Sequence, residues 1–159
     1  MFSKNKYQVC KNMISKELAD FVFNYLRMKK QTFYSLKRLG VDARLLGTDG
    51  DLQAPGTYSC YSDIAMETLL TIIHSKLEKK TKLKLAPTYT YTRLYKNGDV
   101  LKRHQDRFSC EISATLNLGG DMWPIYLEDA NKKEVKVKLN PGDLLIYRGI
   151  ELPHWRKSL

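Results

Sequence analysis

The chain has 159 residues and a mass of 18.5 kDa, which suits one domain with a single hydrophobic core and excludes two domains of ordinary size. Lys and Arg number 27 against 17 Asp and Glu, and the formal net charge of +10 favours anionic partners. No apolar run reaches membrane-spanning length, the first residues lack the apolar stretch of a signal peptide, and Cys10, Cys60 and Cys110 are too widely spaced to suggest a disulfide framework. We therefore expect a single domain over residues 1–159, cytoplasmic and without a membrane segment.

The first half of the chain predicts two helices with an irregular connection between them. Ser15 can cap a helix whose apolar residues recur at helical spacing from Leu18 to Leu26. Residues 31–53 show weak periodicity and several turn residues, so we expect a long loop there that could border a pocket. Ser62 and Asp63 open a second helix with a lysine-rich end.

From Leu85 onward the periodicity changes from helical to strand-like. Short strands separated by turn residues are predicted at 88–95, 100–106, 110–118, 124–127, 134–139 and 143–148. Many short strands after two helices indicate an α+β fold. We expect a jelly-roll core over about 85–159, braced by helical support over about 1–84.

The most informative pattern is an H-x-D pair, His104 and Asp106, followed far along the chain by His154. Side chains alternate along a strand, so His104 and Asp106 point to the same face. Two imidazoles and one carboxylate hold Fe(II) on one side and leave the opposite positions open, whereas a structural zinc site would add a fourth ligand, usually a cysteine. Taken alone the pair is a weak signal, because such residues also occur as ordinary polar groups of a surface or core.

The wider pattern around this pair is more specific. Between Arg93 and Asp106 the residues follow R-x-Y-x-x-G-x-x-L-x-x-H-x-D, and an alternating strand, a Pro-Gly-Asp turn and then His154 come after it. This order resembles the catalytic core of the 2-oxoglutarate and Fe(II)-dependent dioxygenases, and most of all their prolyl 4-hydroxylase-like branch. The resemblance implies a double-stranded β-helix in which His104, Asp106 and His154 bind iron.

The resemblance also implies a binding site for 2-oxoglutarate. It places Tyr95 against a carboxylate of this co-substrate and Thr115, with Asn117, on the wall of its pocket. Arg156 lies two positions past His154 and would face the same pocket if the strand continues. An aromatic strand face such as the one carrying Tyr95 also suits a core, and Trp123, Tyr147 and Trp155 are predicted to be packing residues.

One feature departs from the resemblance. The family usually carries a Lys or Arg about ten residues beyond the second histidine, for the distal carboxylate of 2-oxoglutarate, and the sequence ends at Leu159, before that point. Three explanations stay open: the protein is longer and its last core strand is missing here, the co-substrate binds poorly, or Arg156, Arg93 or Arg103 substitutes.

The implied activity is hydroxylation of a C–H bond in a peptidyl substrate, a prolyl side chain included, or in an amino-acid-like molecule, with release of succinate and CO2. Fe(II), 2-oxoglutarate and O2 would take part, with ascorbate as a candidate addition. We expect the loop 47–56, Arg107 and the Tyr89 face to form the rim that meets the substrate. The alternatives are a nucleic-acid dealkylating oxygenase, which suits the charge but would carry an R-x-N-x-T-x-R string that is missing here, and a non-catalytic jelly-roll binding module. Nucleic acid is thus the less favoured partner, and the sequence does not indicate the oligomeric state.

Overall fold

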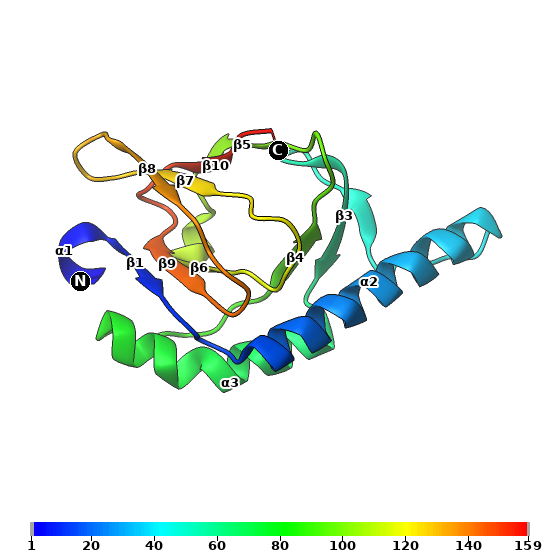
Figure 1. Cartoon of the computed structure of the whole chain (residues 1–159), viewed down its shortest axis with the longest axis horizontal. Coiled ribbons are helices and arrows are strands. Elements are labelled where there is room, and N and C mark those ends of the chain that lie inside the picture. Colours follow the sequence, from blue (N-terminus) through cyan, green and yellow to red (C-terminus); the bar gives the residue numbers. More distant parts are fainter. Residues whose placement is uncertain (1, 159) are drawn as a thin grey trace.

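The computed structural model describes residues 2–158. Its helical elements are α1 (Phe2–Asn5), α2 (Lys16–Arg38), α3 (Ile64–Thr81) and the short 3-10 helix η1 (Phe108–Cys110). Its strands are β1 (Tyr7–Cys10), β2 (Thr48–Gly50), β3 (Pro55–Tyr61), β4 (Tyr91–Leu94), β5 (Leu101–His104), β6 (Ile112–Leu116), β7 (Ile125–Glu128), β8 (Glu134–Val137), β9 (Leu144–Arg148) and β10 (His154–Arg156). Figure 1 shows α2 and α3 running along one side of the molecule, with the strands curled above them.

The described strands form three antiparallel sheets, ordered β1-β9-β6, β5-β10-β7-β8 and β2-β3-β4. Many neighbours are distant in sequence: β1 pairs with β9, and β5 pairs with β10. Such crossing connections are the mark of a jelly roll and not of a simple meander. The architecture agrees with the predicted α+β fold with a jelly-roll core.

Strand β9 sits between the helical layer and the inside of the barrel. Leu144 and Ile146 pack in a cluster with Leu69, Ile73 and Leu77 of α3. The alternate residues Leu145 and Tyr147 pack on the opposite side, with residues of β7 and β8. Because both faces of β9 are buried, its side chains on the barrel side have fixed positions from which a site can be built.

Both predicted helix starts are confirmed. The Ser15 hydroxyl accepts the Leu18 N–H at the start of α2, and the Asp63 carboxylate accepts the N–H groups of Ala65 and Met66 at the start of α3. The same Asp63 carboxylate accepts a 2.8 Å hydrogen bond from the Tyr25 hydroxyl and forms an ion pair with Lys29. One capping residue therefore also fastens α2 to α3.

The predicted irregular connection over 31–53 is wrong in its first part, because α2 continues to Arg38. Phe33 is buried against Ala43 and Tyr58 and anchors this extension. Strand β3 was not predicted: its buried residues 57–60 include Thr and Ser, which a hydropathy pattern does not mark as core. Strand β1, in the region expected to be helical support, joins the barrel through β9.

The six strands predicted from Thr88 onward correspond to β4–β9: five are shorter in the structure, and β7 is shifted by one residue. Strand β5 ends at His104, so Asp106 lies just beyond it and not on the strand as predicted. The strand predicted to deliver His154 is followed by a further short strand, β10, that contains it. Among residues 2–158, no helix combines the length and apolar character needed to cross a membrane.

Candidate metal centre

The structure brings His104, Asp106 and His154 together. His104 and His154 are register partners on β5 and β10, and their ring centroids are 4.2 Å apart. Asp106 Oδ1 lies 3.7 Å from Nε2 of His104 and 3.5 Å from Nε2 of His154. One ligand atom from each residue lies within 4.8 Å of the others, which is close enough to share one metal ion after a small contraction.

Backbone carbonyls orient both imidazoles. Nδ1 of His104 lies 2.8 Å from the Lys102 carbonyl oxygen, and Nδ1 of His154 lies 3.0 Å from that of Leu152. A carbonyl can only accept, so these contacts favour the tautomer with the proton on Nδ1. Nε2 then keeps its lone pair on the side of Asp106, which is the form that binds a metal.

Asp106 is held by two groups and one close backbone approach. Its N–H donates to the Gly149 carbonyl at 2.9 Å, and its Oδ2 accepts the Ser113 hydroxyl at 2.5 Å. A Cβ on Gly149 would lie 2.2 Å from Asp106 Oδ2 and 2.5 Å from Ser113 Oγ. Only glycine fits there. Gly149 was not predicted as a site residue, because its local sequence carries no sign of this approach.

The charge states suit metal binding. Burial opposes ionisation of Asp106, but the neighbouring His154 and the hydrogen bond from the Ser113 hydroxyl hold the pKa of this carboxyl below its usual value. Burial, together with the neighbouring His154, lowers the pKa of His104. At neutral pH the centre therefore offers a carboxylate and a neutral His104 imidazole, as metal ligation requires.

The donor set fits Fe(II). Among the described residues no fourth His, Cys, Asp or Glu joins the group, so a bound ion would keep part of its coordination sphere free. Two imidazoles and a carboxylate with open positions are the ligands of non-haem Fe(II) oxygenases, whereas structural zinc sites are closed by four protein ligands. The side chains of His104 and Asp106 remain 15% and 21% exposed, so the open side can be reached.

Tyr147 forms one wall beside the centre. Its ring meets that of His154 edge-on at 4.7 Å between centroids, and its hydroxyl lies 3.4 Å from Oγ1 of Thr115. Burial raises the pKa of Tyr147 well above its usual value, so the phenol stays protonated and able to donate. Thr115 was predicted to line the 2-oxoglutarate pocket. Tyr147 was taken for a packing residue, since its place in the buried run of β9 gave no other signal.

Arg156 lies beside the same wall. Its guanidinium sits 5.7 Å from the ring of Tyr95 and 5.1 Å from that of Trp123, and one N–H donates to the Trp123 carbonyl at 2.5 Å. Burial lowers the pKa of Arg156, with the phenols of Tyr95 and Tyr147 opposing this. No carboxylate within residues 2–158 forms an ion pair with it. An unneutralised, largely buried cation is costly, so the position suits a bound anion.

Two other arginines were considered for the distal carboxylate of 2-oxoglutarate, and both have acidic partners. Arg103 is exposed and forms a 2.5 Å ion pair with Glu128. Arg93 forms a 2.6 Å ion pair with Asp51 and donates to Gln53, and its Nε is buried without a partner in the described chain. Arg156 is therefore the best placed of the three for a ligand carboxylate.

Asn117 is engaged elsewhere. Its amide nitrogen donates to the Leu139 carbonyl at 2.7 Å, and its amide oxygen accepts the Gly119 N–H at 3.2 Å. It also lies beyond the end of β6. Asn117 therefore supports the loop that follows β6, and its place on the pocket wall stays a prediction.

The residues expected to form the substrate rim make contacts with β4 and with the 3-10 helix η1. Asp51, from the loop 47–56, accepts hydrogen bonds from the Tyr91 hydroxyl at 2.9 Å and from Arg93. The Tyr89 hydroxyl accepts from the Cys110 thiol at 3.3 Å, and the contact with Cys110 together with burial raises the pKa of Tyr89 to about 12, with the positive charge of Arg107 opposing. Tyr89 thus lies beside the segment that follows Asp106, and the loop 47–56 is tied to β4. That both form the substrate rim stays a prediction.

Comparison with known proteins supports the fold. No protein-family model and no curated protein matches the chain. Among solved structures, the fold is similar to that of a prolyl 4-hydroxylase from Pseudomonas putida, with a TM-score of 0.73 and 15% sequence identity. The match covers 99% of this chain and 87% of the hydroxylase chain. The chain therefore has the jelly-roll fold of a prolyl 4-hydroxylase, and its chemistry must be argued from the site.

Proposed function

We propose that this protein is a 2-oxoglutarate- and Fe(II)-dependent oxygenase that hydroxylates a C–H bond of a peptidyl or amino-acid-like substrate. The observation that carries the proposal is the His104, Asp106 and His154 triad, with its open side, on the fold of a prolyl 4-hydroxylase. Neither part suffices alone, because folds host many functions and small metal-like clusters are common. Their coincidence in one chain is more specific than either observation by itself.

The protein would hold Fe(II) through Nε2 of His104, Nε2 of His154 and Oδ1 of Asp106. The ion would supply the activation of O2, coupled to conversion of 2-oxoglutarate into succinate and CO2. The Lys102 and Leu152 carbonyls and the Ser113 hydroxyl keep the three ligands aimed at one point before the metal arrives. Such preorganisation lowers the cost of binding the ion.

The proposed site for 2-oxoglutarate lies between the triad and Arg156. Arg156 would pair with the distal carboxylate and so neutralise its own charge. The phenols of Tyr95 and Tyr147 lie close enough to act on this cation, and Thr115 lies beside the Tyr147 hydroxyl. All three hydroxyls can donate to carboxylate oxygens. The aromatic rings of Tyr95 and Trp123 shield the pair from water and thereby strengthen it.

The substrate would approach over the rim made by the loop 47–56 and the Tyr89 face. Tyr61, Tyr89 and Tyr91 form a partly exposed ring cluster, with centroids 4.8 Å apart for Tyr61 and Tyr89 and 6.4 Å apart for Tyr61 and Tyr91. Aromatic surfaces of this kind bind extended peptide segments, proline-containing ones included. This supports a peptidyl substrate as the first class to test.

The test is succinate release from 2-oxoglutarate, measured with and without Fe(II) and with peptides, amino acids and oligonucleotides as substrates. Wild type should release succinate only with iron, and Asp106→Ala should not. Asp42→Ala is the matched control, since Asp42 is an exposed carboxylate paired with Arg44. Absence of succinate release from wild type with every substrate class would contradict the proposal and favour a binding module. Release that does not require iron would contradict the role of the metal centre. Stimulation by oligonucleotides alone would point to dealkylation.

A further inference from the structure

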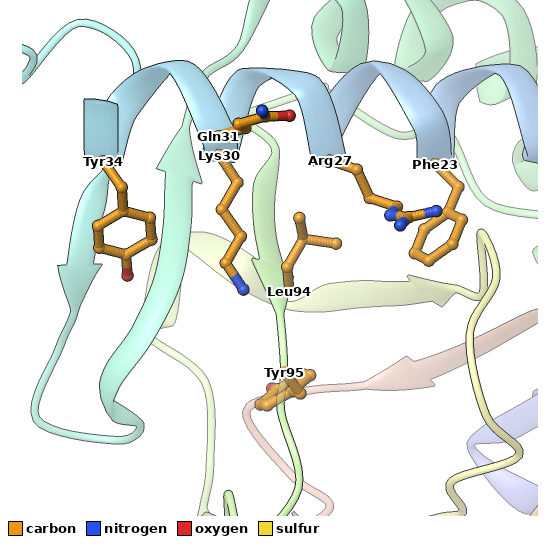
Figure 2. Close-up of a pocket in the computed structure, with 7 residues that line it drawn as sticks. All are labelled: Phe23, Arg27, Lys30, Gln31, Tyr34, Leu94 and Tyr95. Atoms are coloured by element: carbon orange, nitrogen blue, oxygen red, sulfur yellow. The ribbon is translucent and has the colours of Figure 1, made fainter. Parts of the chain in front are cut away.

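A cavity of about 340 Å³ lies between α2 and β4, and none of the three metal-binding residues lines it. Figure 2 shows Phe23, Arg27, Lys30 and Tyr34 hanging from α2 towards Leu94 and Tyr95. The volume is in the range of small-molecule sites. The function proposed above does not use this cavity.

The α2 residues that line the cavity form one stripe of the helix. Phe23, Arg27, Lys30 and Tyr34 follow each other at spacings of four, three and four residues, so they lie on one face. The neighbouring stripe, which holds Ala19, Val22, Leu26 and Phe33, is buried. A helix stripe that borders the core and faces a strand is usually apolar, but this stripe carries two cations, Arg27 and Lys30.

Neither cation is neutralised. Within residues 2–158, no carboxylate forms an ion pair with Arg27 or Lys30, although two neighbours on the same helix have acidic partners, Lys29 with Asp63 and Lys37 with Asp49. Lys30 is half-buried and Arg27 lies at the exposed rim. Two free positive charges in a concave, partly apolar wall concentrate the electrostatic potential there and attract an anion.

Apart from the two cations and Gln31, the residues that line the cavity are aromatic or aliphatic. The Arg27 guanidinium lies 5.8 Å from the ring centroid of Phe23, which faces the cavity together with Tyr34, Leu94 and Tyr95. Rings of this kind stack on planar ligands, and cations beside them bind a charged substituent. The wall therefore selects a ligand with a flat body and an anionic group.

Tyr95 joins this cavity to the site around the metal. It lines the cavity, and it also contacts the Trp123 ring edge-on at 4.7 Å and lies beneath the Arg156 guanidinium. We infer that the cavity binds the anionic, flat-bodied part of the primary substrate, a carboxylate or phosphate attached to a ring. Arg27 and Lys30 hold the anionic group, and Tyr95 separates this part from the co-substrate. This inference deepens the proposed function. That the ligand is the substrate depends on the proposed function, whereas binding of an anion by the cavity does not.

The test uses Trp123 as a reporter, because its ring contacts Tyr95. In a Trp155→Phe background, where Trp123 is the remaining tryptophan, fluorescence is titrated with phenyl phosphate and with benzoate, in the absence of iron and 2-oxoglutarate. Inorganic phosphate tests the anion without a ring, and phenol tests the ring without a full charge. Saturable binding of an aromatic anion that weakens with salt is expected. The tighter of the two aromatic anions identifies phosphate or carboxylate as the preferred group.

Arg27→Gln/Lys30→Gln should weaken binding of the aromatic anion roughly tenfold or more, as expected for loss of charge-assisted contacts. Lys16→Gln/Arg38→Gln removes the same charge from exposed positions of the same helix and should bind like the parent. Circular dichroism checks that all variants are folded. Equal weakening in both double variants, equal binding of phenol, or no binding of either aromatic anion would overturn the inference. Since no turnover is measured, these results are independent of whether succinate is formed.

Discussion

His104 and His154 face each other across the antiparallel pair of β5 and β10, although they are far apart in the sequence. Their register fixes the distance between the two imidazoles, and the carbonyls of Lys102 and Leu152 fix the rotation of each ring. The backbone ladder thus prepares two of the three metal ligands. The third, Asp106, lies outside any strand and depends on neighbouring groups for its position.

Gly149→Ala should reduce metal affinity at least tenfold with little loss of fold. The added Cβ would meet Asp106 Oδ2 at 2.2 Å, so the ligand or the backbone must shift, and metal sites tolerate such shifts poorly. Isothermal titration calorimetry with Fe(II) under anaerobic conditions measures the effect. Gly40→Ala is the control: it strains a backbone of φ 71° but meets nothing within 4 Å, so it should bind metal like wild type. Unchanged affinity in Gly149→Ala would show that Asp106 is not tightly positioned.

Tyr147→Phe should raise the KM for 2-oxoglutarate roughly fivefold, as expected for the loss of one hydrogen bond worth about 1 kcal/mol. The ring that contacts His154 is kept, so metal affinity should not change. Tyr126→Phe serves as the control, because this tyrosine stacks on Trp155 on another strand face. Metal affinity that falls as much as co-substrate affinity would contradict the proposed role.

Tyr95→Phe should likewise weaken 2-oxoglutarate more than iron, since the Tyr95 phenol lies close enough to Arg156 to affect its charge. Parallel titrations of the metal and of the co-substrate separate the two effects. Equal loss of both would count against placing Tyr95 at the co-substrate.

Arg156→Met should weaken 2-oxoglutarate binding about 100-fold, because the distal carboxylate would lose a charge-assisted contact. Without co-substrate, the free energy of unfolding should stay equal or rise, since a buried cation without a carboxylate partner is removed. Arg103→Met breaks the surface pair with Glu128 and should leave co-substrate binding as in wild type. Wild-type affinity for 2-oxoglutarate in Arg156→Met would assign the distal carboxylate to another residue.

Asp63→Asn should lower the free energy of unfolding at neutral pH by roughly 3 kcal/mol, because Lys29 loses its partner in a largely buried pair while Asn still caps α3. Burial opposes ionisation of Asp63, but bonds from Lys29 and Tyr25 hold its folded-state pKa below the ordinary 3.8. A lowered pKa stabilises the fold above the ordinary value, and this stabilisation is lost as the pH falls through the folded value. Wild type should therefore lose stability below about pH 4 more steeply than Asp63→Asn. Urea unfolding across pH measures this, with the exposed Asp20→Asn as control. Identical slopes would contradict the role of the pair.

Local patterns in the sequence predicted the parts of the site that depend on alternation and motif order. Thr115 lies on the face of β6 that meets Tyr147, and Arg156 follows His154 by two positions on β10. Ser113 lies on the same face as Thr115 and was not singled out from the sequence. The N-caps of α2 and α3 were also predicted from the sequence, because each depends on one side chain and the three residues that follow it.

Contacts between segments that are distant in the sequence could not be predicted from local patterns. Tyr147 belongs to a run of buried residues, and only the pairing of β6 with β9 and the return of β10 place it against Thr115 and His154. Strand β1 has four residues and a single partner strand, too little for a periodic signal. Gly149 matters through one approach to Asp106 that no local pattern encodes.

The most direct test of the account is anaerobic calorimetric titration with Fe(II) of wild type, Asp106→Ala and Asp42→Ala. We predict one ion bound per chain in wild type and Asp42→Ala, and loss of that binding in Asp106→Ala with the fold retained by circular dichroism. Absence of stoichiometric binding in wild type, or equal affinity in Asp106→Ala, would contradict the claim that His104, Asp106 and His154 form an iron centre.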